Sequence, residues 1–309
     1  MSPALVAELA GRCTGQVVAG ASLARFTTLR VGGPARVLVT AETPDDLAVV
    51  GEVCRTHRVA TAVVGRGSNL LVDDDGFDGV VVTLGRGFRG VVIDDGDVRA
   101  GAAEPLPTLA ATVADAGLTG FAWACAVPGT LGGAVRMNAG AHGGEIADHL
   151  VEAEVHRLGT SATETWPAAV LGLGYRHSEL PDDAVVTAAR LRFSHGDREA
   201  ERAAIGEIRA WRRANQPLNE PNCGSVFTNP VPRSAGELIE SSGLKGFAIG
   251  GAEVSRRHAN FIVTRPGATA ADVAGLIAEV RRRVEADHGV VLTPEVTWLG
   301  DASRGGRPW

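Results

Sequence analysis

The stretch FAWACAVPGTLGGAVRMNAGAHGGEI, residues 121–146, is the most unusual part of this chain. It is too apolar for an ordinary solvated loop and too rich in glycine for a regular core element. Glycine accounts for 40 of the 309 residues, which is about twice its usual share of about 7%. Because glycine lets the backbone approach a ligand closely, we expect a buried binding loop here.

A second glycine loop, GRGSN at residues 65–69, lies between the strand-like runs TAVVG (61–65) and GVVVTL (79–84). Successive amides in such a loop can form a concave anion site, although an ordinary turn has the same pattern. Residues 128–140 would add a second glycine-lined wall. Two such loops suit a long diphosphate ligand, and the order of elements around them is that of an α/β start.

A literal G-x-G-x-x-G pattern occurs at residues 85–90, directly after a strand-like run. A dinucleotide site of this kind needs a helix next, whereas VVIDDGDV continues as a hairpin with a turn at Asp95 and Gly96. We therefore interpret residues 85–90 as a turn. No phosphate-binding P-loop pattern surrounds Lys245, the only lysine in the chain.

Composition limits the possible classes of protein. Apolar residues make up 45% of the chain and charged residues 21%, with a net charge of −6 and a pI near 5.8. These values favour a globular protein of two or three domains that binds neither nucleic acid nor a membrane surface. Without a signal peptide or an apolar span, we expect a cytoplasmic location. The four cysteines are scattered, which predicts neither a disulfide framework nor a metal site.

Several helices and strands can be predicted from local pattern. Thr43 and Pro44 have the positions of an N-cap and a first helical residue, which predicts a helix over 43–58. Further helices are expected over 105–117, 197–215 and 269–289, and a strand is expected over 290–299. The sequence pattern changes at about residue 197, where a charged amphipathic helix is expected. Such a helix is typical of a connection between domains.

Several motifs in order now show a family resemblance. They are GRGSNLL (65–71), VPGTLGGAVRMNAGAHGGE (127–145), YRHS (175–178), QPLNEPNCGSVFTNP (216–230), AGELIESSGLKG (235–246), HANFIV (258–263) and LTPEV (292–296). From about residue 23 to about 300 the chain resembles the UDP-N-acetylenolpyruvoylglucosamine reductase family of the MurB type. The order of so many motifs makes the resemblance specific.

The resemblance implies a mixed α/β (α+β) fold. A two-part FAD-binding module of the vanillyl-alcohol oxidase and p-cresol methylhydroxylase type would be followed by a C-terminal α+β substrate-binding domain. The boundaries would be 1–85 and 86–200 for the two FAD-binding subdomains and 201–300 for the substrate-binding domain, with a tail at 301–309.

The resemblance also implies the reaction and its cofactors. NADPH would supply hydride through FAD to the enolpyruvyl double bond of UDP-N-acetylglucosamine enolpyruvate, giving UDP-N-acetylmuramate for peptidoglycan biosynthesis, a process of cell wall biogenesis that underlies cell shape and cell division. The partner would be this small nucleotide sugar, and the chain would be a monomer or a weak homo-oligomer.

Three catalytic positions carry over by motif. Arg176 of YRHS would stabilise the enolate with a charge that does not titrate near neutrality. Ser225 of GSVF would donate the proton to carbon, a role that needs a hydroxyl aimed at that atom because serine is a weak acid. Glu295 of LTPEV would take part if burial keeps it protonated. The alternatives are a surface arginine, a turn serine and a solvated glutamate.

The binding positions also follow from the resemblance. FAD contacts map to Gly65, Arg66, Gly67, Ser68, Asn69, Leu70, Gly129, Thr130, Gly132, Gly133 and Gly140. Tyr175 and Asn229 are candidates for substrate binding, although either side chain could instead pack or cap a helix. The chain departs from many relatives at Thr228 and Thr264, where an ammonium and an amide are lost.

Two other functions are compatible with this pattern. One is an FAD-linked oxidoreductase paralogue that acts on another substrate. The other is a nucleotide-binding protein that kept the fold and lost turnover, against which the joint presence of Arg176, Ser225 and Glu295 argues.

Overall fold

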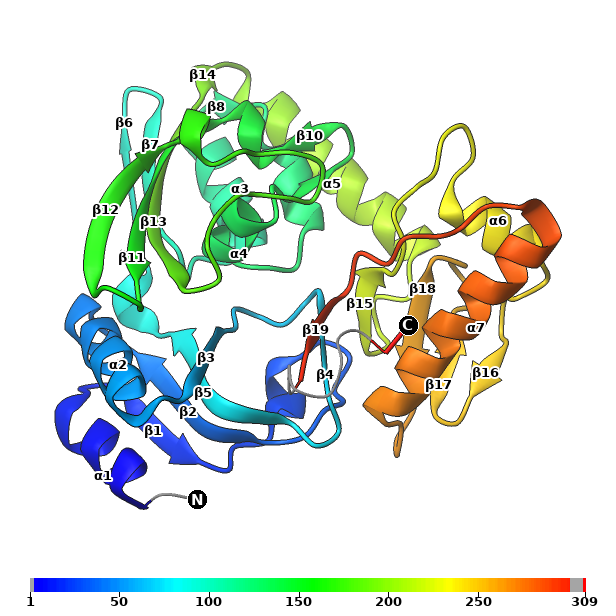
Figure 1. Ribbon diagram of the computed structural model, residues 1–309. Coiled ribbons are helices and arrows are strands. Elements are labelled where there is room, and N and C mark those ends of the chain that lie inside the picture. The colour runs from blue at the N-terminus through cyan, green and yellow to red at the C-terminus, as the bar shows by residue number, and fades with distance from the viewer. Residues whose placement is uncertain (1–2, 301–307) are drawn as a thin grey trace. The chain divides into compact units, whose positions relative to one another are not determined.

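The computed structural model describes residues 3–300 and 308–309, and the chain divides into two compact units (Figure 1). Unit 1 comprises residues 1–19, 37–65 and 79–211, and unit 2 comprises residues 20–36, 66–78 and 212–309. Neither unit is one continuous segment. The expected division at residues 85 and 200 remains a prediction, and of the expected tail only residues 308 and 309 lie within the described part of the chain.

The first sheet of unit 1 has the strand order β1-β2-β5-β3, with β3 parallel to β5 and β1 antiparallel to β2. Its strands are β1 (Gln16–Ala19), β2 (Ala35–Ala41), β3 (Ala60–Val63) and β5 (Phe77–Leu84), and its helices are α1 (Pro3–Arg12) and α2 (Pro44–His57). The predicted cap is confirmed, because the Thr43 hydroxyl accepts the Asp46 N–H and Pro44 begins α2. Apolar side chains of both helices share a core with β2 and β5.

The second sheet of unit 1 is antiparallel, with the order β12-β11-β13-β7-β6. Its strands are β6 (Val91–Asp94), β7 (Asp97–Gly101), β11 (Leu150–Arg157), β12 (Ala162–Pro167) and β13 (Ala184–Arg192). Helices α3 (Leu106–Asp115) and α4 (Leu131–Arg136) share a large apolar core with this sheet (Figure 1). Four short strands and most of a long helix complete the unit: β8 (Leu118–Thr119), β9 (Gly140–Ala141), β10 (Gly144–Glu145), β14 (Ser194–His195) and α5 (Arg198–Asn215).

The interpretation of the glycine pattern at 85–90 is confirmed. Residues Arg86–Phe88 form a short 3-10 helix, and β6 and β7 follow as a hairpin. The turn residues Asp95 and Gly96 have φ values of 40° and 85°, the signs that a two-residue turn between twisted strands requires. No dinucleotide-binding helix follows the pattern.

Unit 2 is built around an antiparallel sheet with the order β15-β18-β17-β16. Its strands are β15 (Asn222–Ser225), β16 (Ala248–Ile249), β17 (Ala252–Val254) and β18 (Phe261–Thr264), and its helices are α6 (Ala235–Ser241) and α7 (Ala270–His288). A separate parallel pair joins β4 (Leu70–Val72) to β19 (Thr297–Leu299). The mixture of helices and sheets confirms the expected α+β class.

Two expectations about local structure were wrong in part. Residues 121–146 are largely buried as expected, but they contain the 3-10 helix Ala122–Ala126 and helix α4 rather than an unbroken loop. The strand expected over 290–299 is confined to Thr297–Leu299. Pro294 has no N–H to donate, and the segment before β19 makes only an isolated bridge, between Pro294 and Phe227.

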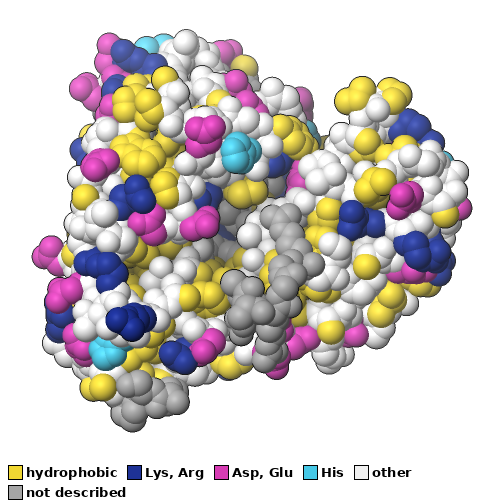
Figure 2. Space-filling model, viewed as in Figure 1, with side chains coloured by type: hydrophobic (Ala, Val, Ile, Leu, Met, Phe, Trp, Pro, Cys, Tyr) yellow, Lys and Arg dark blue, Asp and Glu magenta, His cyan; other side chains and the backbone are white. Residues whose placement is uncertain are grey.

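The visible face of the molecule (Figure 2) carries side chains of both charges. On the face drawn in Figure 2, Lys and Arg side chains are interspersed with Asp and Glu. Within residues 3–300 and 308–309, every helix is too short or too polar to span a bilayer.

Candidate functional site

The first predicted cofactor loop is shaped by close backbone packing. Gly67 has a φ of 58°, and a Cβ atom there would overlap the carbonyl oxygen of Phe26. The Gly67 carbonyl accepts the Thr28 N–H at 3.2 Å. Gly67 is buried, whereas Gly65 and Arg66 are exposed. Gly67 is therefore required for the fold of unit 2, and the exposed part of the loop begins before it.

The end of this loop is bonded to the segment that carries Glu295. The Asn69 side-chain amide donates to the Glu295 carbonyl at 2.9 Å. The Asn69 carbonyl accepts the Thr297 N–H at 2.9 Å, and Leu70 then lies opposite Thr297 in the β4–β19 pair. Within unit 2, the structure thus brings a predicted cofactor residue next to a predicted catalytic residue.

Ser225 lies on the chain segment that pairs with Glu295. The Glu295 N–H donates to the Val226 carbonyl at 2.8 Å. Ser225 ends β15 directly after an irregularity in the strand pairing, where Gly224 has a φ of 77°. Such irregularities re-aim side chains at the end of a strand. The two predicted catalytic residues of unit 2 are therefore neighbours across one backbone pair.

Asn260 holds this segment from the opposite side, and it was not among the predicted site residues. Its side chain accepts the Phe227 N–H at 2.9 Å and donates to the Phe227 carbonyl at 2.8 Å. Its own carbonyl accepts the Val226 N–H at 2.9 Å. Asn260 is 3% exposed, so these bonds have no competition from water. The available signal was its place in the HANFIV motif.

Cys223 lies close to the same site but carries no reactive charge. Burial raises the pKa of its thiol to about 12. Because the thiolate is the nucleophile and metal-binding form, Cys223 is inert near neutrality.

The remaining residues of interest in unit 2 have structural contacts. The Asn229 side-chain oxygen accepts the Ala235 N–H at 3.1 Å at the start of α6, which is the capping alternative considered for it. Thr228 donates its hydroxyl to the Thr293 carbonyl at 3.3 Å. Thr264 is buried and donates to the Leu29 carbonyl at 2.6 Å. A role of Asn229 in substrate binding remains a prediction.

In unit 1 the two predicted glycine loops meet at Thr130. A Cβ atom at Gly65 would lie 3.1 Å from the Thr130 hydroxyl oxygen, and one at Gly133 would lie 3.6 Å from it. Gly65 and Gly133 are both exposed. Bare backbone from two loops therefore flanks one hydroxyl group, an arrangement that fits close approach by a phosphate-bearing ligand.

Gly132 has a different use within the second loop. Its N–H donates to the Ala102 carbonyl at 2.9 Å, and a Cβ atom there would lie 2.9 Å from the Ala102 methyl group. Glycine at this position allows α4 to pack close to the end of β7. Its N–H is engaged within the protein, and a contact of Gly132 with the cofactor remains a prediction.

Arg176 occupies a tight turn in unit 1. Gly174 and His177 bond to each other through both backbone groups, and Arg176 between them has a φ of 53°. For a residue with a side chain this left-handed conformation costs roughly 1–2 kcal/mol. Its guanidinium donates to the Gly140 carbonyl at 2.7 Å and lies 4.9 Å from the centre of the Tyr175 ring, which is 59% exposed. Backbone strain of this kind concentrates at functional sites.

Two residues that sequence reasoning missed hold this turn in place. Asn138 is fully buried, donates to the Gly174 carbonyl at 3.0 Å and accepts the Ala147 N–H at 2.9 Å. Ser178 donates its hydroxyl to the Arg136 carbonyl at 2.6 Å. Asn138 itself has a φ of 38°, which asparagine tolerates better than most residues. Its position next to alanine and glycine in MNAG was the available signal.

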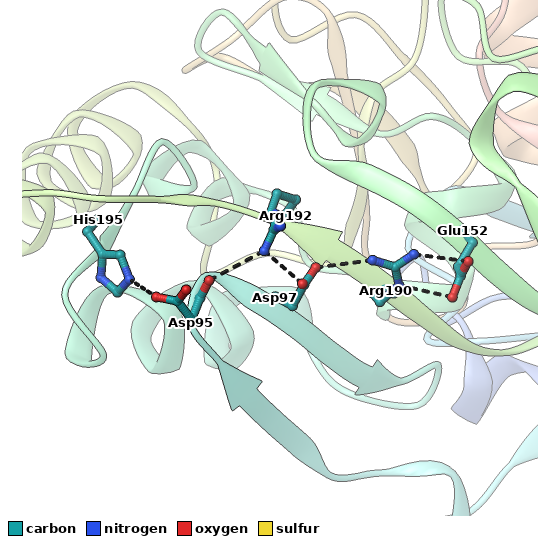
Figure 3. Close-up of polar contacts among 6 residues, drawn as sticks. All are labelled: Asp95, Asp97, Glu152, Arg190, Arg192 and His195. Atoms are coloured by element: carbon teal, nitrogen blue, oxygen red, sulfur yellow. Dashed lines mark hydrogen bonds and ion pairs between the residues drawn. The ribbon is translucent and has the colours of Figure 1, made fainter.

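A separate set of charges covers the outer face of the second sheet in unit 1 (Figure 3). Arg190 pairs with Glu152 at 3.0 Å and with Asp97 at 3.2 Å, and Arg192 pairs with Asp97 at 2.7 Å. A shallow hollow on this face is lined by Arg99, Glu152, Glu154, Thr165, Ala188, Ala189 and Arg190. Its charges are paired with one another, so this face offers no unmet charge to a ligand. Across residues 3–300 and 308–309, His, Cys, Asp and Glu side chains form no group of three that could hold a metal ion.

Two family models match separate parts of this chain. Residues 35–159 match a family model described as FAD binding domain, and residues 216–299 match one described as UDP-N-acetylenolpyruvoylglucosamine reductase, C-terminal domain. A protein of Methylorubrum populi named UDP-N-acetylenolpyruvoylglucosamine reductase is 44% identical, with 94% of each chain covered. A Heliobacterium modesticaldum protein of the same name is 46% identical over 93% of this chain and 92% of its own.

Solved structures extend the comparison to the fold. The crystal structure of UDP-N-acetylenolpyruvylglucosamine reductase from Thermus caldophilus matches with a TM-score of 0.78 and 37% identity, over 92% of this chain and 98% of that one. A Physcomitrella patens BBE-like protein matches with a TM-score of 0.50 and 19% identity, over 62% of this chain and 44% of its own. The second likeness concerns the fold alone. The expected FAD-binding module is confirmed by the family model.

Proposed function

The chain belongs to the UDP-N-acetylenolpyruvoylglucosamine reductase family, and from that premise we propose how its residues reduce UDP-N-acetylglucosamine enolpyruvate to UDP-N-acetylmuramate. The enzyme is an FAD-dependent oxidoreductase of peptidoglycan biosynthesis, and the family takes its reducing equivalents from NADPH. The observation that carries the proposal is the joining of an FAD binding domain at 35–159 to the C-terminal domain of this family at 216–299.

The residues present fit FAD, which when bound carries hydride from NADPH to the substrate double bond. The exposed backbone of Gly65 and Gly133 beside the Thr130 hydroxyl supports this fit. The residues proposed to hold the cofactor are Gly65, Arg66, Gly67, Ser68, Asn69, Leu70, Gly129, Thr130, Gly132, Gly133 and Gly140. Gly67 and Gly132 would act by shaping the loops, because their packing leaves no room for a side chain.

Arg176 is proposed to stabilise the substrate enolate. Adding hydride to the terminal carbon of an enolpyruvyl ether moves negative charge onto the carboxylate, so the intermediate is a dianion. The Arg176 guanidinium is a planar fork of N–H donors that bonds to the Gly140 carbonyl at 2.7 Å. A fork of this shape matches a carboxylate in a bidentate manner. Preplaced donors of this kind lower the barrier because they do not have to reorient during the reaction.

Ser225 and Glu295 are proposed to complete the reaction. Ser225 would donate the proton to the carbon next to the carboxylate. Glu295 would donate a hydrogen bond to the enolate when protonated, since its charged form would repel it. The backbone pairing of Val226 with Glu295 supports their joint action, because it keeps the two side chains on neighbouring segments.

The proposal also covers the substrate-binding residues, the domain division, the oligomeric state and the location of the protein. Tyr175, next to Arg176 and well exposed, would bind the sugar or the carboxylate, with Asn229 as a second contact. The three-part division at residues 85 and 200, a monomeric or weakly oligomeric state and a cytoplasmic location belong to the same proposal. None of the four cysteines is joined to another by a disulfide within the described residues, which supports a reducing compartment.

The test separates the two halves of the reaction. In the Ser225→Ala variant, reduction of bound FAD by NADPH should keep its rate. Formation of UDP-N-acetylmuramate should fall by about 10²–10⁴-fold, the usual contribution of a general acid. Stopped-flow absorbance follows the first half and product chromatography the second. Unchanged product formation would remove Ser225 from the mechanism.

An assay of the wild-type protein tests the assigned reaction. Oxidation of NADPH that depends on UDP-N-acetylglucosamine enolpyruvate supports the assignment. Rapid hydrogen peroxide formation from a different substrate would instead favour an FAD-linked oxidoreductase with another specificity.

A further inference from the structure

The hairpin of β9 and β10 in unit 1 carries the carbonyl that holds Arg176. Its two-residue loop consists of His142 and Gly143, with φ values of 49° and 85°. Positive φ at both positions is the pattern of a type I′ turn, for which asparagine and glycine are preferred. The base of the hairpin is Gly140, whose carbonyl accepts the Arg176 guanidinium at 2.7 Å. A shift of this hairpin would therefore shift the proposed enolate-binding group.

The side chain at the tip of the hairpin has a specific contact. The His142 ring meets the Trp211 ring edge to face, with centroids 5.3 Å apart and planes at 90°. Such pairs contribute about 0.5–1.5 kcal/mol beyond their buried area. Histidine, like asparagine, is enriched among residues that adopt a left-handed conformation. Unlike asparagine, histidine brings an aromatic ring to Trp211, which gives a reason for histidine at this position.

The hairpin is also held from beneath. Gly144 packs so closely on the indole of Trp123 that a Cβ atom would overlap its ring. Trp123 is 5% exposed and part of the buried core of unit 1. Trp123 thus supports the hairpin at the strand pair next to the loop, and Trp211 of α5 contacts the loop residue His142.

We infer that His142 is a positioning residue for Arg176, acting through its contact with Trp211. The inference rests on the proposed function of Arg176. By fixing the tip of the hairpin, His142 fixes the Gly140 carbonyl at its base, and that carbonyl orients the guanidinium. A misplacement of a catalytic group by about 1 Å can cost about 10²-fold in rate, so partial loosening of the hairpin has a measurable effect.

The test replaces each ring. The variant His142→Asn keeps a residue that accepts positive φ and removes the aromatic contact. We expect kcat for the enolpyruvyl substrate to fall about 10-fold, since the hairpin stays in place but moves more. Reduction of FAD by NADPH should be unchanged, because the role proposed for Arg176 is to stabilise the enolate in the other half-reaction. Trp211→Leu, a change on a side chain that is 47% exposed, should reproduce the effect.

The double variant distinguishes positioning from a general structural role. If the two rings act as one contact, His142→Asn combined with Trp211→Leu lowers kcat no further than either single change. His195→Asn is the matched control, because His195 is an exposed histidine of unit 1 paired with Asp95 on the outer sheet face. It should turn over like the wild type.

Each outcome decides the inference. Wild-type kcat in both single variants overturns it, as does an equal loss in both half-reactions or a multiplicative loss in the double variant. If His142→Asn fails to fold, Trp211→Leu alone carries the same comparison of half-reactions. A wild-type enzyme without substrate-dependent turnover would overturn the proposed function instead, which is a different result.

Discussion

The turn at 174–177 in unit 1 and the paired segments at 225–227 and 293–295 in unit 2 hold their proposed catalytic groups differently. Arg176 lies in a strained left-handed conformation, and its charged end is held by a carbonyl. The serine and glutamate lie on backbone that pairs with neighbouring backbone and is secured by the buried side chain of Asn260.

The difference between Arg176 and Ser225 reflects the reach of the side chains. Arginine is long and flexible, so its backbone position alone does not place its guanidinium, and a second contact at the far end is needed. Serine is short, so fixing its backbone nearly fixes its hydroxyl. Changes at the two sites should therefore separate effects on charge placement from effects on the fold.

The largest effect is expected at Arg176. Replacement by alanine or by glycine should lower kcat/KM by about 10³-fold, near the upper value for loss of one preorganised electrostatic group. The two variants should differ in stability, because glycine accepts a φ of 53° without strain. We expect the unfolding free energy of Arg176→Gly to exceed that of Arg176→Ala by about 1 kcal/mol. Denaturant titration of both variants measures this difference. Equal stability would contradict the strained conformation.

A smaller effect, on the fold, is expected at Asn260. Its replacement by alanine leaves the buried N–H and carbonyl of Phe227 without the partners that Asn260 supplies. We expect the unfolding free energy to fall by about 3 kcal/mol. Urea denaturation followed by tryptophan fluorescence measures the loss. The matched control is Asn222→Ala, since Asn222 also bonds to backbone, including the Gly224 N–H at 2.9 Å, but is only half-buried. Comparable losses in both variants would argue against burial as the cause.

The smallest effect is expected at Asp46. Like Asn260, Asp46 is a buried side chain that hydrogen-bonds to backbone groups, but it carries a charge. Its carboxylate accepts the N–H groups of Thr14 at 2.7 Å and Glu42 at 2.7 Å, and the side chain is buried. Burial by itself would raise the pKa of Asp46, but these hydrogen bonds lower it below its usual value. Asp46→Asn should cost about 2 kcal/mol at pH 7, as expected for hydrogen bonds to a charged group.

The stability that Asp46 contributes should decrease at low pH. The folded-state pKa of Asp46 is lowered, so its stabilisation is complete above the unfolded-state value of about 3.9 and is lost as pH falls through the folded value. The difference between wild type and Asp46→Asn should therefore shrink below about pH 4. Thermal unfolding of both proteins at pH 7 and pH 3 measures it, and a constant difference would show that geometry alone is responsible.

Sequence reasoning succeeded where the information is local. The cap at Thr43, the turn at Asp95 and Gly96 and the rejection of residues 85–90 as a dinucleotide site each depend on a few adjacent residues. The strand expected over 290–299 was too long because apolar pattern does not reveal which backbone partner is present. The short helix α4 was missed because its glycines argue against a helix until the packing against Ala102 is known.

The sequence by itself determined the family, the FAD cofactor and the identity of the candidate catalytic residues, because ordered motifs record chemistry that a chain of this kind performs. Only the tertiary structure decided how the motifs are used. It separated Gly67 and Gly132, which serve packing, from the exposed Gly65 and Gly133. It also showed Asn138, Asn260 and the contact of His142 with Trp211. These contacts join residues far apart in the chain, and no local pattern encodes which distant backbone a buried side chain will meet.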